Sequence, residues 1–101
     1  MFKFVALYKT PADHEAFMAH YRDVHMPLVK KLPGLISAEI TKLGPAMMGE
    51  KGNFLLAEMR FADETAFKTA MKSPENAAAG KDLDAFAAEI VTVMKGEVVA
   101  I

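Results

Sequence analysis

The chain contains no cysteine and no tryptophan among its 101 residues. The absence of cysteine excludes disulfide bonds, thiolate metal ligands and thiol nucleophiles. Long hydrophobic runs are lacking too, since no apolar stretch approaches the roughly 18 residues of a membrane span. The segment Met1–Lys9 has neither the apolar region nor the small-residue cleavage site of a secretory signal. These absences predict a cytoplasmic protein that has no membrane partner.

Neither sign of charge is in excess, because 12 Lys and Arg residues face 13 Asp and Glu residues. No run of basic residues occurs anywhere in the chain. A nucleic-acid backbone is bound by clustered Lys and Arg side chains. We therefore expect no nucleic-acid partner.

Apolar residues are plentiful: they make up 52% of the chain and include eight Met and seven Phe. The length predicts one domain over residues 1–101. Ordinary core filling accounts for this composition. An adaptable apolar pocket or a subunit interface would also use many methionines, because their side chains pack into irregular shapes.

Hydrophobic patterning predicts four strands, at Phe2–Lys9, Leu35–Leu43, Asn53–Phe61 and Ile90–Ile101. Two helical regions fall between the first and second strands and between the third and fourth. The order β-α-β-β-α-β is that of an α+β, ferredoxin-like fold, with a four-stranded antiparallel sheet and two helices on one face.

The first helix is predicted to start with Thr10 as its cap and Pro11 at its first position. It should end near His25 or Met26, because Pro27 removes a backbone donor and disfavours helical geometry at the residue before it.

The second helical region reads as interrupted. Asp63 is predicted to cap one helix and Ser73 to begin a short helical turn. Gly80 is predicted to break the helix, and Asp82 to cap a brief last one.

Several strands are apolar on both faces, although helices in this fold cover only one face of the sheet. In the first strand, for example, Phe2 and Phe4 alternate with Val5 and Leu7. An exposed apolar sheet would promote aggregation. The pattern therefore predicts a homodimer in which two sheets pair to form a barrel, with partners for the few charges on that face, Glu58 and Arg60.

Tyr21 and His25 are the candidate proton-transfer pair. Their spacing of four residues places them on one flank of the first helix, on the inward side that also carries Phe17 and Val24. A histidine there can act as a general acid or base, and a phenol can orient or donate. A position near a helix C-terminus favours the imidazolium form. A structural histidine in the core is the alternative, and no carboxylate at helical spacing orients His25.

We expect no metal site. His14 and His25 lie about 16 Å apart along a helix axis that rises 1.5 Å per residue, and His20 is predicted on the opposite flank. We also expect no cofactor. The glycines of the loop 44–52 join two strands, whereas a phosphate-binding loop precedes a helix, and the chain has no dinucleotide fingerprint.

The segment from Phe17 to Leu28, with His20-Tyr21-Arg22 and His25-x-Pro27 inside it, resembles the EthD family, named for ethyl tert-butyl ether degradation. Leu32-Pro33-Gly34, the run 57–61, Ser73-Pro74-Glu75 and Asp82-x-x-x-Phe86 extend the likeness over nearly the whole chain. The resemblance implies a dimeric α+β barrel. It also implies functional roles for His25 and Tyr21.

Relatives on this fold include cofactorless monooxygenases, lactone isomerases and aromatic polyketide dehydratases or cyclases. The first hypothesis is therefore an enzyme, either a cofactorless oxidoreductase or a dehydratase or isomerase, that acts on an aromatic or carbonyl compound. Tyr8, Phe17 and Phe61 are the candidate pocket walls. The alternatives are a non-catalytic protein that binds a hydrophobic metabolite for an oxygenase, and a purely structural role for the histidine.

Overall fold

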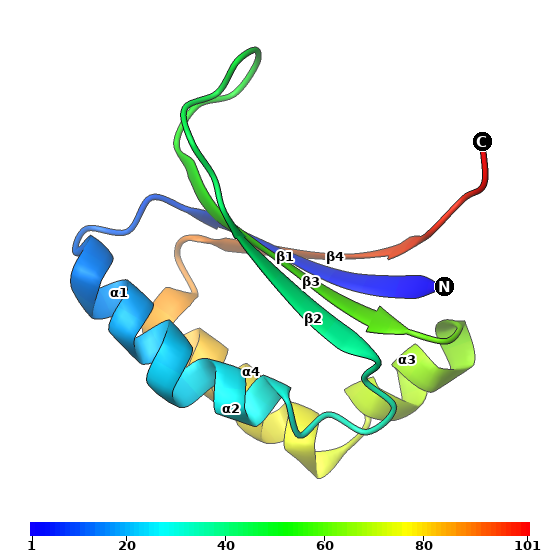
Figure 1. Cartoon of the computed structure of the whole chain (residues 1–101). Coiled ribbons are helices and arrows are strands. Elements are labelled where there is room, and N and C mark those ends of the chain that lie inside the picture. The colour runs from blue at the N-terminus through cyan, green and yellow to red at the C-terminus, as the bar shows by residue number, and fades with distance from the viewer.

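The computed structural model describes residues 1–101 and shows one four-stranded antiparallel sheet with its helices on one face (Figure 1). The elements along the chain are β1 (Phe2–Lys9), α1 (His14–His20), η1 (Tyr21–His25), α2 (Met26–Val29), β2 (Ser37–Lys42), β3 (Asn53–Phe61), α3 (Glu64–Met71), α4 (Pro74–Ala87) and β4 (Val91–Glu97). The strands lie in the order β2-β3-β1-β4. This arrangement confirms the predicted ferredoxin-like fold. No helix is long and apolar enough to cross a membrane.

The helices on both sides of the β-hairpin begin at aspartates. The carboxylate of Asp63 accepts a hydrogen bond from the amide of Ala66, which confirms the predicted cap of α3. The cap of α1 is Asp13 and not the predicted Thr10. The hydroxyl of Thr10 donates instead to the carbonyl of Gly52, which ties the end of β1 to the β2–β3 loop.

The first helical region does not stop before its proline. It continues through η1, a π-helical turn in which the amide of Met26 donates to the carbonyl of Tyr21. Met26 keeps helical angles, φ −62° and ψ −39°, so the predicted departure from helical geometry there is wrong. Pro27 lies in the first turn of α2, where a missing N–H group costs little.

The wider turn of η1 changes which residues face the sheet. Tyr21, His25 and Met26 are buried, but Val24 is 43% exposed. The prediction that Val24 points inward is wrong, because a π-helical turn does not keep the spacing of 100° per residue.

Helix α4 is continuous from Pro74 to Ala87, with Ser73 as its cap. The predicted break at Gly80 and the predicted cap at Asp82 are therefore wrong. One glycine inside a helix costs only about 1 kcal/mol relative to alanine, and Ala79 and Ala87 pack into the core on the same helix. Asp82 thus lies within the helix, where its carboxylate can contact another element.

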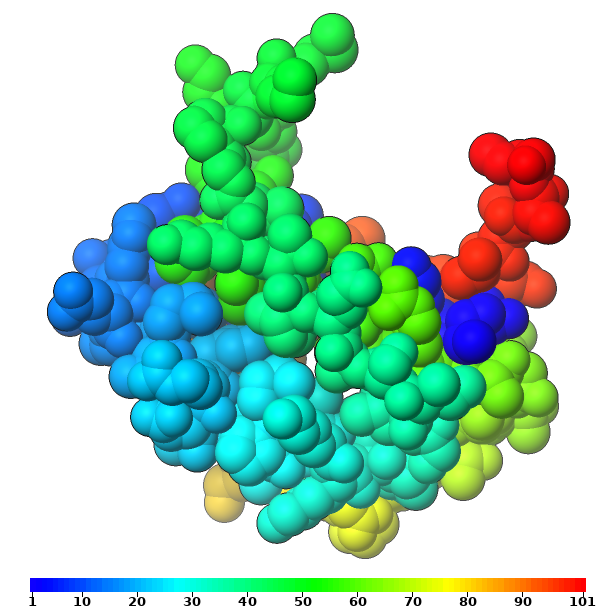
Figure 2. Space-filling view, viewed as in Figure 1, coloured from blue at the N-terminus to red at the C-terminus, as the bar shows by residue number.

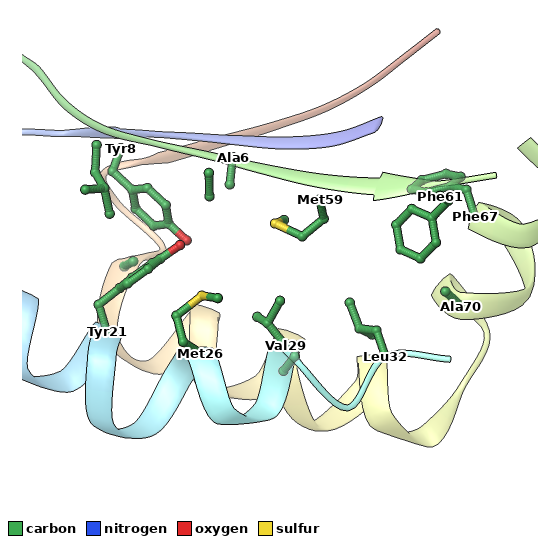
Figure 3. Packing of buried hydrophobic residues seen from close by; sticks show 14 of the residues in the cluster. Ala6, Tyr8, Tyr21, Met26, Val29, Leu32, Met59, Phe61, Phe67 and Ala70 are labelled. Atoms are coloured by element: carbon green, nitrogen blue, oxygen red, sulfur yellow. The ribbon is translucent and has the colours of Figure 1, made fainter. Parts of the chain in front are cut away.

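The core fills the space between the sheet and the helices (Figure 3). Alternate residues of β1 and β3 point toward the helices, and Met26, Val29 and Leu32 point back toward the sheet. Strand β4 ends at Glu97, short of the predicted Ile101. The helices and the core side chains cover the inward faces of β1 and β3 within one chain.

The outer face carries no helix (Figure 1). Its central side chains, by register, are Val5, Leu7, Leu56 and Met94. Glu58 pairs with Lys3 at 2.9 Å, and Arg60 lies 3.6 Å from Glu39. The two charges that were predicted to need partners on this face find them in the same chain.

Candidate functional site

A cavity of about 140 Å³ lies between the sheet and the helical layer. Most of its wall is apolar, and its polar groups come from β1, η1 and α4. The lining residues are Phe4, Ala6, Tyr8, Tyr21, His25, Val29, Leu32, Met59, Met71, Asn76, Ala79, Gly80, Leu83 and Val93. An apolar cavity with a few convergent polar groups is the usual form of a small-molecule site.

Two tyrosines face each other across this space. Tyr8 descends from β1 and Tyr21 rises from η1, so that their hydroxyls point toward one another (Figure 3). Their ring centroids are 5.5 Å apart, with the rings nearly perpendicular. Burial raises the pKa of Tyr21 to about 12 and raises the pKa of Tyr8 still further. Both phenols therefore keep their protons near neutral pH, and one or the other can donate a hydrogen bond to a ligand.

His25 lies beside this pair. It is 5% exposed, and its ring centroid is 5.5 Å from that of Tyr21, so the two residues do share a flank as their spacing predicts. Its Nδ1 lies 3.0 Å from Oδ2 of Asp82 on α4. A carboxylate only accepts, so Nδ1 carries the hydrogen and Nε2 of the neutral ring keeps a free electron pair. Nε2 is thus the nitrogen available to accept a proton.

The environment holds His25 in the neutral form. Desolvation by burial lowers its pKa, and this outweighs the hydrogen bond and the charge of Asp82, which act in the opposite direction. The helix C-terminus was expected to favour the imidazolium form, but the net change in the pKa is downward, because burial is the largest effect here.

Asp82 also binds a second histidine. Nε2 of His20 lies 2.8 Å from Oδ1 and 3.1 Å from Oδ2 of the same carboxylate. The ring of Phe86, one turn further along α4, contacts both imidazoles, with centroids 4.4 Å from His20 and 5.1 Å from His25. His20 was predicted on the opposite flank of the helix, but Asp82 brings it into the same cluster as His25.

Sequence reasoning missed Asp82 because it searched for a carboxylate at helical spacing, whereas this one lies 57 residues further along the chain. The sequence pattern predicts Asp82 only as a helix cap and as part of the motif Asp82-x-x-x-Phe86. A continuous second helix, had it been recognised, would have placed Asp82 and Phe86 one turn apart on the face that meets the first helical region.

The three candidate wall residues lie in different places. Tyr8 lines the cavity. Phe17 packs against Tyr8 and lines a separate surface groove of about 520 Å³ between the start of α1 and the end of α4. Phe61 is fully buried against Phe67, away from the cavity lining.

No group of three or more His, Asp or Glu side chains is placed to hold a metal ion. The segment 43–52 joins two strands and extends away from the sheet (Figure 1), with Met47 and Met48 exposed near its tip.

A protein-family model described as the EthD domain matches residues 9–90. The chain is 30% identical over 94 residues to an uncharacterized 11.0 kDa protein from the thcB–thcC intergenic region of Rhodococcus erythropolis, covering 93% of this chain and 91% of that one.

Solved structures give the same result. A crystal structure of an ethyl tert-butyl ether degradation (EthD) family protein from Bacillus halodurans is similar with a TM-score of 0.93 and 39% identity, covering 98% of this chain and 99% of that one. A dimeric protein with a ferredoxin-like fold from Bacteroides fragilis is similar at 20% identity and a TM-score of 0.62, over 96% and 95% of the two chains.

Proposed function

Because this chain belongs to the EthD family, we propose that it is a small-molecule enzyme in which His25 accepts a proton from an aromatic or carbonyl compound. The observation that carries the proposal is the buried His25–Asp82 pair at a cavity that also presents two protonated phenols. Enzymes that abstract protons commonly use a base that a carboxylate orients. Hydrogen-bond donors on the other side of the substrate then stabilise the negative charge that develops.

In the proposed step, Nε2 of His25 takes a proton from a substrate O–H group or from a C–H group beside a carbonyl. The electron pair of the broken bond stays on the substrate as a phenolate or enolate. The hydroxyl of Tyr21 or Tyr8 donates to the oxygen that gains this charge, and Asp82 stabilises the imidazolium that forms. The same step can begin an isomerisation or a dehydration, and an oxidation would need dioxygen as a second substrate to take up the electrons.

The size of the cavity favours a compact substrate. A volume of about 140 Å³ is close to that of an apolar cavity that accommodates one benzene ring. We therefore propose a substrate in which a single ring, or a short apolar group, enters the cavity with its oxygen toward the tyrosines. Independence from cofactors and a cytoplasmic location stay predictions from the sequence.

A proton-exchange experiment tests the proposal. Phenols, quinones, lactones and polyketide-like aromatics are first screened for thermal stabilisation of the wild type, His25→Ala and His14→Ala. Compounds that stabilise are then incubated in D₂O, and deuterium uptake at carbon beside a carbonyl is followed by NMR, because O–H protons exchange with the solvent unaided. We expect His25→Ala to slow exchange by about 10²-fold or more. His14→Ala, an exposed histidine outside the cavity lining, should leave the rate unchanged.

A non-catalytic metabolite carrier is the second candidate, and the fully exposed Met47 and Met48 favour it as a surface for a partner protein. It predicts compounds that stabilise the wild type and His25→Ala equally, with no deuterium uptake in either. That result would contradict the enzymatic proposal.

The outer face of the sheet supports a homodimer. The segment 43–52 and the C-terminal residues 98–101 both project on this side of the sheet, on either side of an open space (Figure 2). Val98, Val99 and Ile101 are exposed there. A second copy, packed sheet to sheet, would cover these apolar side chains and form the barrel. Light scattering that finds only monomers would refute this assembly.

A further inference from the structure

The Asp82 carboxylate is shared between two histidines whose surroundings differ. The side chain of His25 is 6% exposed, that of Asp82 is 14% exposed and that of His20 is 34% exposed. His25 lines the cavity, whereas His20 lines the surface groove at the start of α1 and the end of α4. The carboxylate therefore connects a buried imidazole to a solvated one.

A single negative charge can compensate only one of these rings fully when both could carry a proton. The free energy of charging a ring rises with its desolvation, so the charge costs less at His20 than at His25. The wall of the groove adds three further carboxylates on the side of His20, from Asp13, Asp84 and Glu89. The titratable groups that face His25 are Asp82 and His20, together with the phenols of Tyr21 and Tyr8 in the same cavity.

We propose that His20 is a positioning residue that works through Asp82: by drawing on the negative charge of the carboxylate from the solvent side, it keeps the buried His25 unprotonated and ready to accept a proton. Asp82 still accepts the Nδ1 hydrogen of His25 and so fixes the orientation of the ring. His20 limits how strongly the same carboxylate stabilises the imidazolium.

This inference rests on the proposed role of His25 as the base, but its test does not need turnover. The titration midpoint of each histidine is measured by NMR from its ring Cε1–H signal in the wild type, His20→Gln and Asp82→Asn. Glutamine can still donate a hydrogen bond to Asp82 but cannot carry a charge. We expect His20→Gln to raise the His25 midpoint by roughly one pH unit, about tenfold in proton affinity.

Asp82→Asn should move the His25 midpoint in the opposite direction, because the stabilising negative charge is lost. Opposite shifts from two neighbouring substitutions are not the result of general loosening of the fold. The control is His14→Gln, which removes the third histidine without touching Asp82 and should leave the midpoint in place. Circular dichroism establishes that each variant is folded.

A His25 midpoint that stays in place or falls in folded His20→Gln would overturn the inference. A shift of the expected sign in a protein that exchanges no substrate proton would support the coupling between the histidines and contradict the proposed function instead. Where a substrate is found, kcat/KM is measured against pH. The apparent pKa of the acidic limb of this profile should be higher in His20→Gln than in the wild type, by the same amount as the NMR midpoint.

Discussion

The two faces of the sheet are made of similar residues but meet different surroundings. The inner face lies under the helices and is mostly buried along β1 and β3, and the cavity there contains the candidate site. The outer face has apolar side chains at its centre and ion pairs beside them, and nothing in the chain covers it. In the proposals above, a single chain holds its chemistry on one face and uses the other for assembly.

Leu55 and Leu56 give the sharpest comparison, because they are adjacent and identical in type. Leu55 is 1% exposed on the inner side, whereas Leu56 is half-buried on the outer side. We expect Leu55→Ala to destabilise the fold by about 3 kcal/mol, within the usual range for a buried leucine. Leu56→Ala should cost about 1 kcal/mol at protein concentrations where the chain is monomeric.

Chemical denaturation at two protein concentrations measures both costs. For Leu56→Ala the cost should grow at high concentration, where dimerisation stabilises the wild type. For Leu55→Ala it should not depend on concentration. An equal loss of unfolding free energy in Leu55→Ala and Leu56→Ala would show that the two faces do not differ in burial.

The outer face can be disrupted directly with a charge. Leu7 lies opposite Leu56 of β3 and Thr92 of β4, at the centre of this face. Leu7→Glu should weaken the dimer by 10²-fold or more, roughly 3 kcal/mol or more, because an unpaired carboxylate would be buried between two sheets. Thr69→Glu, which adds the same charge on the exposed surface of α3, is the control. Light scattering on dilution series measures the dimer dissociation constant of each variant. Equal dissociation constants for Leu7→Glu and Thr69→Glu would contradict the proposed interface.

The sequence alone predicted the sheet well. The bounds of β1 and β3 agree with the prediction at both ends, because apolar alternation and flanking turn residues are local signals. The fold class follows from the order of strands and helices along the chain, and this order is predicted even where the bounds of a helix are not.

The helices were predicted less well, because tertiary contacts override local signals there. Pro27 and Gly80 are helix breakers by propensity, yet one lies in a first turn and the other in a helix held by its buried alanines. The error at Gly80 had a consequence for the site. A break at Gly80 makes Asp82 a helix cap, so the sequence does not predict its contact with His25 between α4 and η1.

The smallest expected effect concerns the inner face and its buried histidine. Burial lowers the pKa of His25 below its ordinary value of 6.5 in the folded state. As the pH falls below about 6.5, the unfolded chain binds a proton at this position before the folded chain does. The contribution of His25 to stability is therefore complete above that pH and is lost as the pH falls toward the folded-state pKa.

Denaturation curves of the wild type and His25→Gln between pH 8 and pH 5 isolate this contribution, because glutamine can donate to Asp82 but does not titrate. Each pKa unit of displacement corresponds to about 1.4 kcal/mol, so the difference between the two proteins should be smaller than the loss from Leu55→Ala. As the pH falls, the free energy of unfolding of the wild type should decrease relative to that of His25→Gln. No comparable loss is expected from His14→Gln, because His14 is exposed in the folded protein as well. A difference curve that stays flat would mean that burial does not lower the pKa of His25, and one that favours the wild type increasingly at low pH would mean that the fold raises it. Either result would contradict the view that the inner face holds His25 as a neutral base.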